Sequence, residues 1–205
     1  PTAAPAPTVN TTCVTYPPPS ALPPVQLPGF RMAHPRLPHP TPADIALLRA
    51  RNPDYLNQMS SAARNNARAI DTIMQASFIQ PGIVNLAPLH AKLMETRFFD
   101  RGHGQVMPLA IAYDWLHDQW TTAEREALRA KLAEGCDYLV KVIRDEQLSP
   151  YNAFLYNAPL QALMACSIAL YGDDARGEAF MRFTHELWKN RVLPVWRQVF
   201  GRNGG

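Results

Sequence analysis

Proline is the residue that most constrains how this chain can fold, because its distribution is very uneven. Thirteen of the 20 prolines lie at or before Pro42, and seven follow it. Runs such as Pro17-Pro18-Pro19 favour the extended polyproline conformation and cannot lie inside a helix. The sequence therefore predicts two regions, an extended proline-rich arm or linker over residues 1–40 and a folded domain over residues 41–205.

Helix signals dominate the region after residue 40. Thr41-Pro42-Ala43-Asp44 combines an N-cap, a proline at the first helical position and an acidic residue in the first turn. Thr121-Thr122-Ala123-Glu124 is a capping box, and apolar residues recur after both starts at three- and four-residue spacings. The predicted helices cover about residues 41–51, 53–77, 106–115, 121–143, 150–171 and 173–188. Residues 81–104 are predicted to be rich in loops, and Pro194 is predicted to interrupt the helical pattern.

No segment shows the sustained alternation of polar and apolar residues that is typical of a half-buried strand. The predicted fold class is therefore all-α. Long helices joined by short loops favour antiparallel neighbours, either in a bundle or as hairpins stacked around an axis. Periodicity alone does not choose between these two arrangements.

Charge and cysteine content exclude several classes of protein. The formal net charge is +3, spread along the chain, so nucleic acid is not predicted as a partner. No apolar run is long enough to span a membrane. Cys13, Cys136 and Cys166 lie far apart, which excludes zinc fingers and haem attachment. The sequence leaves open whether Cys136 pairs with Cys166, and two buried free thiols are the expected outcome.

Both ends of the sequence bear on where the protein works. The chain begins at Pro1 and stops at Gly204-Gly205, so we expect both ends to be trimmed. The proline-rich arm is typical of a spacer that follows an export signal. We therefore expect an exported protein, located in the periplasm or outside the cell.

Three short motifs carry a resemblance to a known family. They are Ala33-His34-Pro35-Arg36-Leu37, the segment LAIAYDWLHD at residues 109–118, and residues 151–157 leading to Tyr171-Gly172-Asp173. In order and spacing they resemble the N-terminal half of heparinase II/III-like and alginate-lyase-like polysaccharide lyases, over residues 33–205. The resemblance implies helical hairpins that form an incomplete α/α toroid, because the family carries further catalytic residues beyond the glycine-rich turn that Gly204-Gly205 would begin.

The resemblance also implies a reaction, β-elimination on a polysaccharide that contains uronic acid. Removal of the C5 proton beside a carboxylate requires a group that neutralises the carboxylate, together with a base and an acid. That chemistry needs no metal, and no cofactor is expected. The neutralising residue is expected at Asn152, with Asn157 as the alternative, at a helix N-terminus whose dipole favours an anion. A helix cap or a hairpin-linking hydrogen bond is an equally open interpretation of either asparagine.

Four other residues are candidates for substrate binding. Tyr151 and Tyr156 offer ring faces for a sugar, although core packing is the open alternative for Tyr156. Arg101 and His103 place a cation and a titratable ring in a glycine-flanked loop, where an ordinary surface position is the alternative for His103.

The other motif residues are expected to support the scaffold. Tyr113 and Trp115 are expected to fill the core, and Asp114 is expected to tie a neighbouring hairpin by hydrogen bonds rather than to act in catalysis. His34 and Arg36 lie where an arm would be attached to the first helices.

The predicted function is that of the N-terminal helical portion of a polysaccharide lyase, whose active site is incomplete within this segment. Its expected partners are an acidic polysaccharide and the missing C-terminal part of the same polypeptide. The alternative is a non-catalytic module that binds saccharide or protein, which the absence of a histidine after Asn152 favours, since Ala153 follows it. A third possibility is an assembly part that associates with itself.

Overall fold

The structure is a computed structural model, and it describes residues 15–65, 70–154 and 158–197. Within these ranges the chain forms helices and no β-strand, apart from an isolated bridge between Tyr171 and Asp174. The all-α prediction is confirmed for these residues. The α-helices are α1 (Pro42–Arg51), α2 (Tyr55–Asn65), α3 (Ile70–Ile79), α4 (Ala87–Met94), α5 (His103–Trp115), α6 (Thr122–Asp145), α7 (Pro150–Phe154), α8 (Pro159–Leu170) and α9 (Gly177–Glu186).

Three shorter helical turns complete the described fold. They are the 3₁₀ turns η1 (Pro19–Ala21) and η2 (His117–Gln119) and the π-helical turn η3 (Leu187–Val192). Among the helices of the described ranges, none combines the length and the hydropathy needed to cross a membrane.

Both predicted capping motifs form as expected. In α6 the Thr121 backbone N–H donates to Glu124 Oε2 at 3.0 Å, and the Glu124 N–H donates to Thr121 Oγ1 at 3.3 Å. Thr41 and Asp44 make the same pair of bonds at the start of α1. Each box satisfies two backbone donors that a helix start leaves without partners. α6 runs for 24 residues from its box, which corresponds to about 36 Å.

Two predicted helices are divided in the structure. The helix predicted over residues 53–77 is replaced by two helices, α2 and α3. They pack against each other, which two parts of one straight helix cannot do. The helix predicted over residues 150–171 is divided into α7 and α8. Ala158 has a left-handed backbone, with φ of 41°, and Pro159 has no N–H to continue an earlier helix. A new helix therefore begins at Pro159.

Three other predicted boundaries are wrong. α4 lies inside the stretch predicted to be rich in loops. α9 begins at Gly177, whereas Asp173 belongs to the turn before it. That turn brings two backbones together, because a Cβ at Gly177 would lie 2.5 Å from the Leu170 carbonyl oxygen. Pro194 does not interrupt the helical backbone, which continues to residue 197. The wider η3 turn ends two residues before this proline, whose ring would clash with the carbonyl four residues earlier in a regular α-helix.

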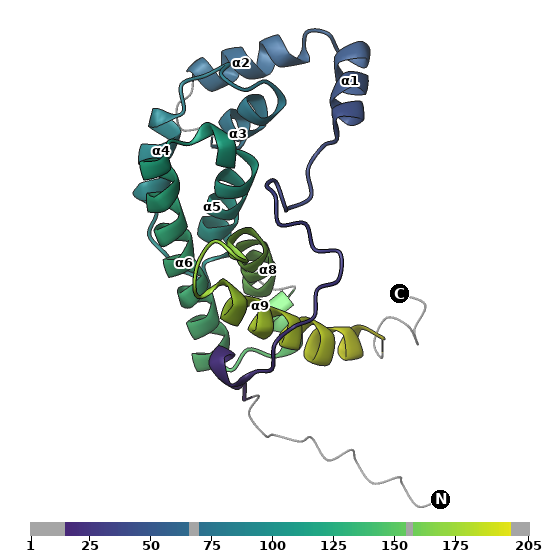
Figure 1. Cartoon of the computed structure of the whole chain (residues 1–205), viewed down its shortest axis with the longest axis vertical. Coiled ribbons are helices and arrows are strands. Elements are labelled where there is room, and N and C mark those ends of the chain that lie inside the picture. The colour runs from purple at the N-terminus through teal and green to yellow at the C-terminus, as the bar shows by residue number, and fades with distance from the viewer. Residues whose placement is uncertain (1–14, 66–69, 155–157, 198–205) are drawn as a thin grey trace, which may run out of the picture.

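α8 is the central helix of the core. It packs against α5, α6 and α9 (Figure 1), and nine of its 12 residues are buried. Alanines at 162, 165 and 169 allow its neighbours to approach closely. The fully buried side chains with which α5 and α6 fill the remaining space include Leu109, Tyr113, Leu128, Leu132, Leu139 and Ile143. A helix buried on most sides needs this apolar composition.

Two successive helical hairpins contribute to this core. The start of α5 meets the end of α6, where Arg101 Nε donates to Glu146 Oε2 at 3.1 Å, so these two helices are antiparallel. α8 and α9 form the second hairpin, in which Ser167 Oγ donates to Thr184 Oγ1 at 3.1 Å. Short connections between amphipathic helices favour this antiparallel pairing.

A disulfide bond joins the two hairpins. Cys136 on α6 and Cys166 on α8 are both fully buried, and their Cα atoms lie 6.1 Å apart. The expectation of two buried free thiols is therefore wrong, because the neighbouring helices bring the two side chains together. Disulfides persist in oxidising compartments, so this bond is consistent with an exported protein.

The described part of the proline-rich arm lies over the helices as an extended segment (Figure 1). It starts beside the end of α6, where the buried Tyr16 hydroxyl donates to the Leu148 carbonyl at 2.5 Å. Arg182 of α9 donates to the Leu22 carbonyl at 3.1 Å. The arm then passes α5 and α8 before it reaches α1 (Figure 1). Residues 34–37 make its densest set of polar contacts, described next.

Candidate functional site

Asp114 on α5 holds the arm through contacts with three polar groups that belong to residues 34–37. Its carboxylate is fully buried and accepts the backbone N–H groups of Arg36, at 2.9 Å, and Leu37, at 2.8 Å. It also lies 2.5 Å from His34 Nδ1. Leu37 is buried beside it. A carboxylate accepts hydrogen bonds from several directions at once, so one side chain can fix this bend of the arm.

Asp173 holds the same segment from the other side, in the turn after α8. Its carboxylate accepts from His34 Nε2 at 2.7 Å, from Arg36 Nη2 at 2.8 Å and from the Tyr113 hydroxyl at 2.8 Å. The turn exists because Gly172 adopts a left-handed backbone, with φ of 85°. We name the five residues His34, Arg36, Tyr113, Asp114 and Asp173 the arm lock.

The protonation states of the arm lock follow from these contacts. Burial alone would lower the pKa of His34, but its hydrogen bonds to Asp114 and Asp173 outweigh burial and raise the pKa above the ordinary 6.5. Both ring nitrogens then donate to carboxylates, which defines an imidazolium. Burial opposes ionisation of Asp173, yet hydrogen bonds from His34, Arg36 and Tyr113 lower its pKa far below the usual range. Burial and the hydrogen bond to Asp173 raise the pKa of Tyr113.

These shifts favour a structural role for the arm lock over an acid–base role. A general acid or base works best with a pKa near the pH at which the protein acts. The pKa of Asp173 is lowered and that of Tyr113 is raised, so both groups are held away from that range. The arm lock is therefore suited to fixing the arm on α5 and α8.

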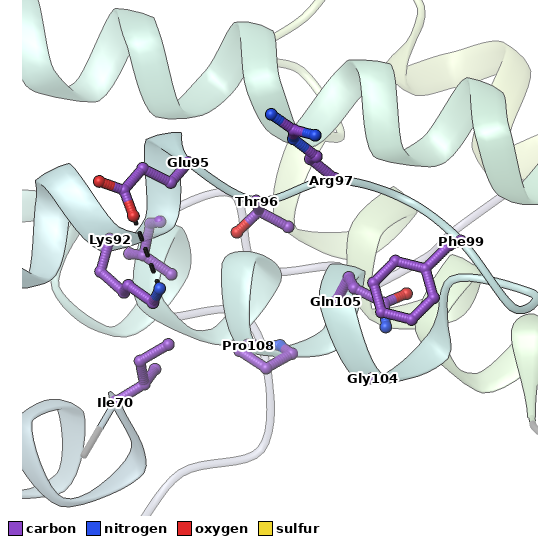
Figure 2. Close-up of a pocket in the computed structure, with 10 residues that line it drawn as sticks. Ile70, Lys92, Glu95, Thr96, Arg97, Phe99, Gly104, Gln105 and Pro108 are labelled. Atoms are coloured by element: carbon purple, nitrogen blue, oxygen red, sulfur yellow. Dashed lines mark hydrogen bonds and ion pairs between the residues drawn. The ribbon is translucent and has the colours of Figure 1, made fainter. Parts of the chain in front are cut away.

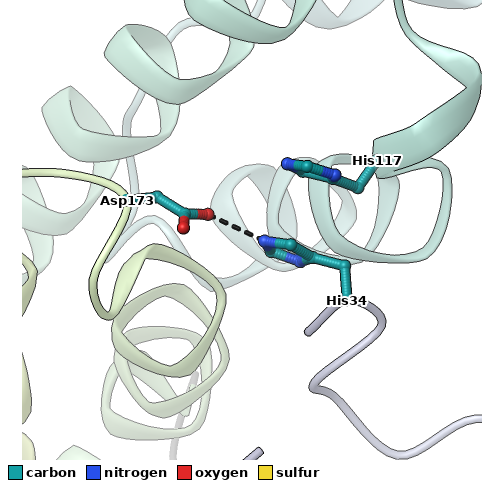
Figure 3. Close-up of side chains that lie close together, drawn as sticks. All are labelled: His34, His117 and Asp173. Atoms are coloured by element: carbon teal, nitrogen blue, oxygen red, sulfur yellow. Dashed lines mark hydrogen bonds and ion pairs between the residues drawn. The ribbon is translucent and has the colours of Figure 1, made fainter. Parts of the chain in front are cut away.

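His117 stacks on the arm lock and completes a group with metal-ligand chemistry. The possible ligand atoms of His34, His117 and Asp173 lie within 4.8 Å of one another (Figure 3). The two imidazole rings are nearly parallel, with an interplanar angle of 9° and centroids 3.9 Å apart. An imidazole binds a metal in its own ring plane, and both His34 nitrogens already face carboxylates. This geometry fits a hydrogen-bonded lock better than a metal centre.

An open hollow of about 250 Å³ lies beside His117 and is lined by two arginines of α6. Arg125 Nη1 donates to the His117 carbonyl at 3.3 Å, and Arg129 Nη1 donates to the Asp173 carbonyl at 3.2 Å. Neither carbonyl carries a charge that would neutralise a guanidinium. Among the acids that line the hollow, Asp173 already pairs with Arg36, and Glu126 is exposed.

The hollow can therefore present two guanidinium groups to an anion. Its neighbour His117 has a pKa below the ordinary 6.5, mainly because of burial, and the charges of His34 and Arg125 lower it further. The hydrogen bond to Asp118 opposes this shift. A neutral imidazole beside two arginines is compatible with an acidic ligand.

The residues predicted to form the substrate site lie elsewhere. Asn152 is half-buried on α7, where its backbone N–H donates to Ser149 Oγ at 3.2 Å. Arg101 pairs with Glu146, four residues before α7, so it lies at the same end of the α5–α6 hairpin as Asn152.

His103 begins α5, and burial lowers its pKa. Asn157 and Tyr156 lie outside the described residues, as does the side chain of Tyr151.

The arm lock corrects two scaffold interpretations. Asp114 ties the arm rather than a neighbouring hairpin. His34 and Arg36 attach the arm to α5 and to the turn after α8, not to the first helices. Neither the role of Asp173 nor the arginine pair of α6 was predicted from the sequence. The spacing of Arg125 and Arg129, four residues apart on one helix, was the available signal for that pair.

Together these features define an all-α chain, over its described residues, whose N-terminal arm is fixed to a disulfide-linked helical core beside an arginine-lined hollow. Comparisons of the chain with protein-family models, with curated proteins and with solved structures gave no match.

Proposed function

We propose that the chain is the N-terminal helical portion of a polysaccharide lyase that cleaves uronic-acid-containing polysaccharide by β-elimination. In this proposal the hairpins α5–α6 and α8–α9 belong to an incomplete α/α toroid, and the partner is an acidic polysaccharide. The same proposal includes that the protein is exported and that the C-terminal part of the same polypeptide completes its active site.

The observation that carries the acidic-polymer part of the proposal is the arginine-lined hollow. Arg125 and Arg129 donate there to uncharged carbonyls and form no ion pair with another described residue, although the charge of Arg129 also acts on Asp174, so both guanidinium groups can attract a carboxylate. The arm lock adds support, because parts of all three motifs of the resemblance meet in it. His34 and Arg36 come from the first motif, Asp114 from the second and Asp173 from the third.

One observation favours the alternative, a non-catalytic module that binds acidic saccharide. The pKa values of Tyr113 and Asp173 are shifted away from neutrality, and both ring nitrogens of His34 are already bonded to carboxylates, so the arm lock offers no ready acid or base. Under this alternative the hollow binds the polymer without changing its length.

An activity assay on variants tests the lyase proposal at the residue level. In the full-length polypeptide, Asn152→Ala should lower kcat on a uronate polymer by about a hundredfold, as loss of one donor to a developing oxyanion does. Asn65→Ala changes an exposed asparagine on α2 and should leave kcat unchanged. A normal kcat in Asn152→Ala would refute the role of Asn152. Binding of the polymer with no cleavage by the unmodified polypeptide would favour the alternative.

A further inference from the structure

A second hollow, of about 380 Å³, opens between the end of α4 and the start of α5 (Figure 2). Lys92 on α4 and Gln105 on α5 line it, together with Thr96, Arg97 and Phe99 of the connecting segment. It lies toward the opposite end of α5 from the arm lock, since Gln105 and Tyr113 are separated by eight residues, or about 12 Å along the helix axis.

Phe99 places an exposed aromatic ring on the wall of this hollow. Successive side chains of an extended segment point to opposite sides. Phe98 accordingly packs inward, with its ring 5.8 Å from that of Tyr138, whereas Phe99 is 60% exposed. Exposed aromatic rings are costly in water, and a ring face packs well against the apolar C–H face of a sugar.

A strained turn fixes the position of Phe99. The next three residues, Asp100, Arg101 and Gly102, all have left-handed backbones, with φ of 44°, 63° and 72°. Two of them are not glycine and adopt this conformation at a cost. At Gly102 a Cβ would lie 3.0 Å from the Tyr138 ring, so a side chain there would be crowded as well as strained by the left-handed backbone. Such strain concentrates at ligand sites, where the surrounding structure holds a side chain in place.

Gln105 contributes a buried acceptor that lacks a donor. Its Oε1 atom is shielded from solvent, and no hydrogen-bond donor of the described residues reaches it. An unpaired buried polar group costs about 1–3 kcal/mol. A rotation of the half-buried Gln105 side chain that turns Oε1 toward the hollow would let a ligand hydroxyl supply the missing hydrogen bond.

Two cations, Lys92 and Arg97, and one acid, Glu95, line the hollow, so the net positive charge of these three side chains favours an acidic ligand. Lys92 Nζ lies 3.5 Å from Glu95 Oε2, but the two side chains are 47% and 70% exposed, so the pair is weak. Arg97 is exposed on the same wall. A carboxylate entering the hollow would therefore meet one weakly paired ammonium group and one guanidinium group.

We propose that this hollow is a subsite for one acidic sugar residue. The sugar packs its C–H face on Phe99, a sugar hydroxyl donates to Gln105 Oε1 once this side chain turns toward the hollow, and the carboxylate lies near Lys92 and Arg97. The subsite rests on the proposed function for the identity of its polymer, and it is separate from the arginine-lined hollow and from Asn152.

Calorimetric binding of an alginate tetrasaccharide to the full-length polypeptide tests this subsite, with neutral maltotetraose as the control ligand. Phe99→Ala and Gln105→Leu should each weaken binding about five- to tenfold, equivalent to the loss of one hydrogen bond or one ring contact. Leu47→Ala is the matched control, because Leu47 is a large exposed apolar residue on α1, 49% exposed, outside the hollow.

The stability of Gln105→Leu separates a binding role from a structural one. Replacing an unpaired buried amide by an apolar group of similar shape should leave the free energy of unfolding unchanged or higher, while binding weakens. If Gln105→Leu lowered the free energy of unfolding so far that unfolded protein explained the weaker binding, the assignment of Gln105 to the subsite would be overturned.

Other outcomes separate the subsite from the proposed function. Unchanged binding in both variants of a polypeptide that cleaves uronate polymer would overturn the subsite alone. Equal binding of maltotetraose would overturn its acidic selectivity, and a loss of binding in Leu47→Ala equal to that in Phe99→Ala would overturn the assigned location. Absence of both binding and cleavage of uronate polymers would overturn the subsite and the proposed function together.

Discussion

Asp114→Asn should release the proline-rich arm and destabilise the fold. The Asp114 carboxylate is fully buried and accepts the backbone N–H groups of Arg36 and Leu37 together with His34 Nδ1. Asparagine keeps one oxygen but presents an NH₂ group where the second acceptor stood. At least one of the donors would then face another donor in a buried position.

The expected cost follows from the kind of contact that is lost. A hydrogen bond to a charged group contributes about 1.5–3 kcal/mol. Removing one partner of a buried charge pair costs about 3–5 kcal/mol, because the other charge is left buried without a partner. Because Asp114 combines both kinds of contact, we expect the free energy of unfolding to fall by about 3–5 kcal/mol. Unfolding in urea, followed by circular dichroism, measures this change.

A matched variant controls for the loss of negative charge alone. Asp118 also lies beside a histidine, with Oδ1 2.9 Å from His117 Nδ1, but its side chain is 88% exposed. Asp118→Asn should leave the urea midpoint unchanged and the arm protected from limited proteolysis. The account of the arm lock would be refuted if Asp114→Asn unfolded within about 1 kcal/mol of the unmodified chain and kept the arm protected.

Three further changes test other parts of the fold. The pKa of His34 is raised in the folded state, so its contribution to stability is fully present below 6.5 and is lost as the pH rises through the folded pKa. Urea unfolding at a series of pH values should show this loss. A His34→Gln variant whose free energy of unfolding changed with pH above 6.5 as steeply as that of the unmodified chain would contradict it. Reduction of the Cys136–Cys166 bond, which closes a separation of 30 residues, should lower stability by about 3–4 kcal/mol by the chain-entropy argument; an unchanged thermal midpoint would contradict this. Gly177→Ala should cost about 1–3 kcal/mol in urea unfolding, because its Cβ would lie 2.5 Å from the Leu170 carbonyl oxygen; a neutral substitution would show that the turn adjusts freely.

Local chemistry explains which parts of the fold the sequence could predict. The capping boxes at Thr41 and Thr121 are satisfied within four residues, so the pattern predicts them directly. The division between α7 and α8 combines Pro159, a local break signal that the predicted helix over residues 150–171 passed over, with the left-handed Ala158, a residue type that gives no turn signal. α9 starts at Gly177 and not at Asp173, after a turn in which Gly177 lies close to the Leu170 carbonyl, a contact between residues seven positions apart that no local pattern indicates.

The candidate site was harder to predict because its parts are distant in the sequence. His34 and Asp173 are 139 residues apart, and only the fold brings them to hydrogen-bonding distance. Each motif could therefore be recognised in the sequence by itself, whereas the contacts between them in the arm lock could not be predicted from the sequence. The disulfide bond is similar, since two isolated cysteines reveal no pairing until α6 and α8 are placed side by side.

Cleavage of an acidic polymer tests the proposed function most directly. The full-length polypeptide is incubated separately with alginate, with hyaluronan and with neutral dextran. Chain length is followed by size-exclusion chromatography, and the unsaturated uronate product is followed by ultraviolet absorbance. The proposed function requires shorter chains and rising absorbance with at least one of the two uronate polymers, and neither with dextran. Unchanged alginate and hyaluronan in the presence of folded protein would contradict it.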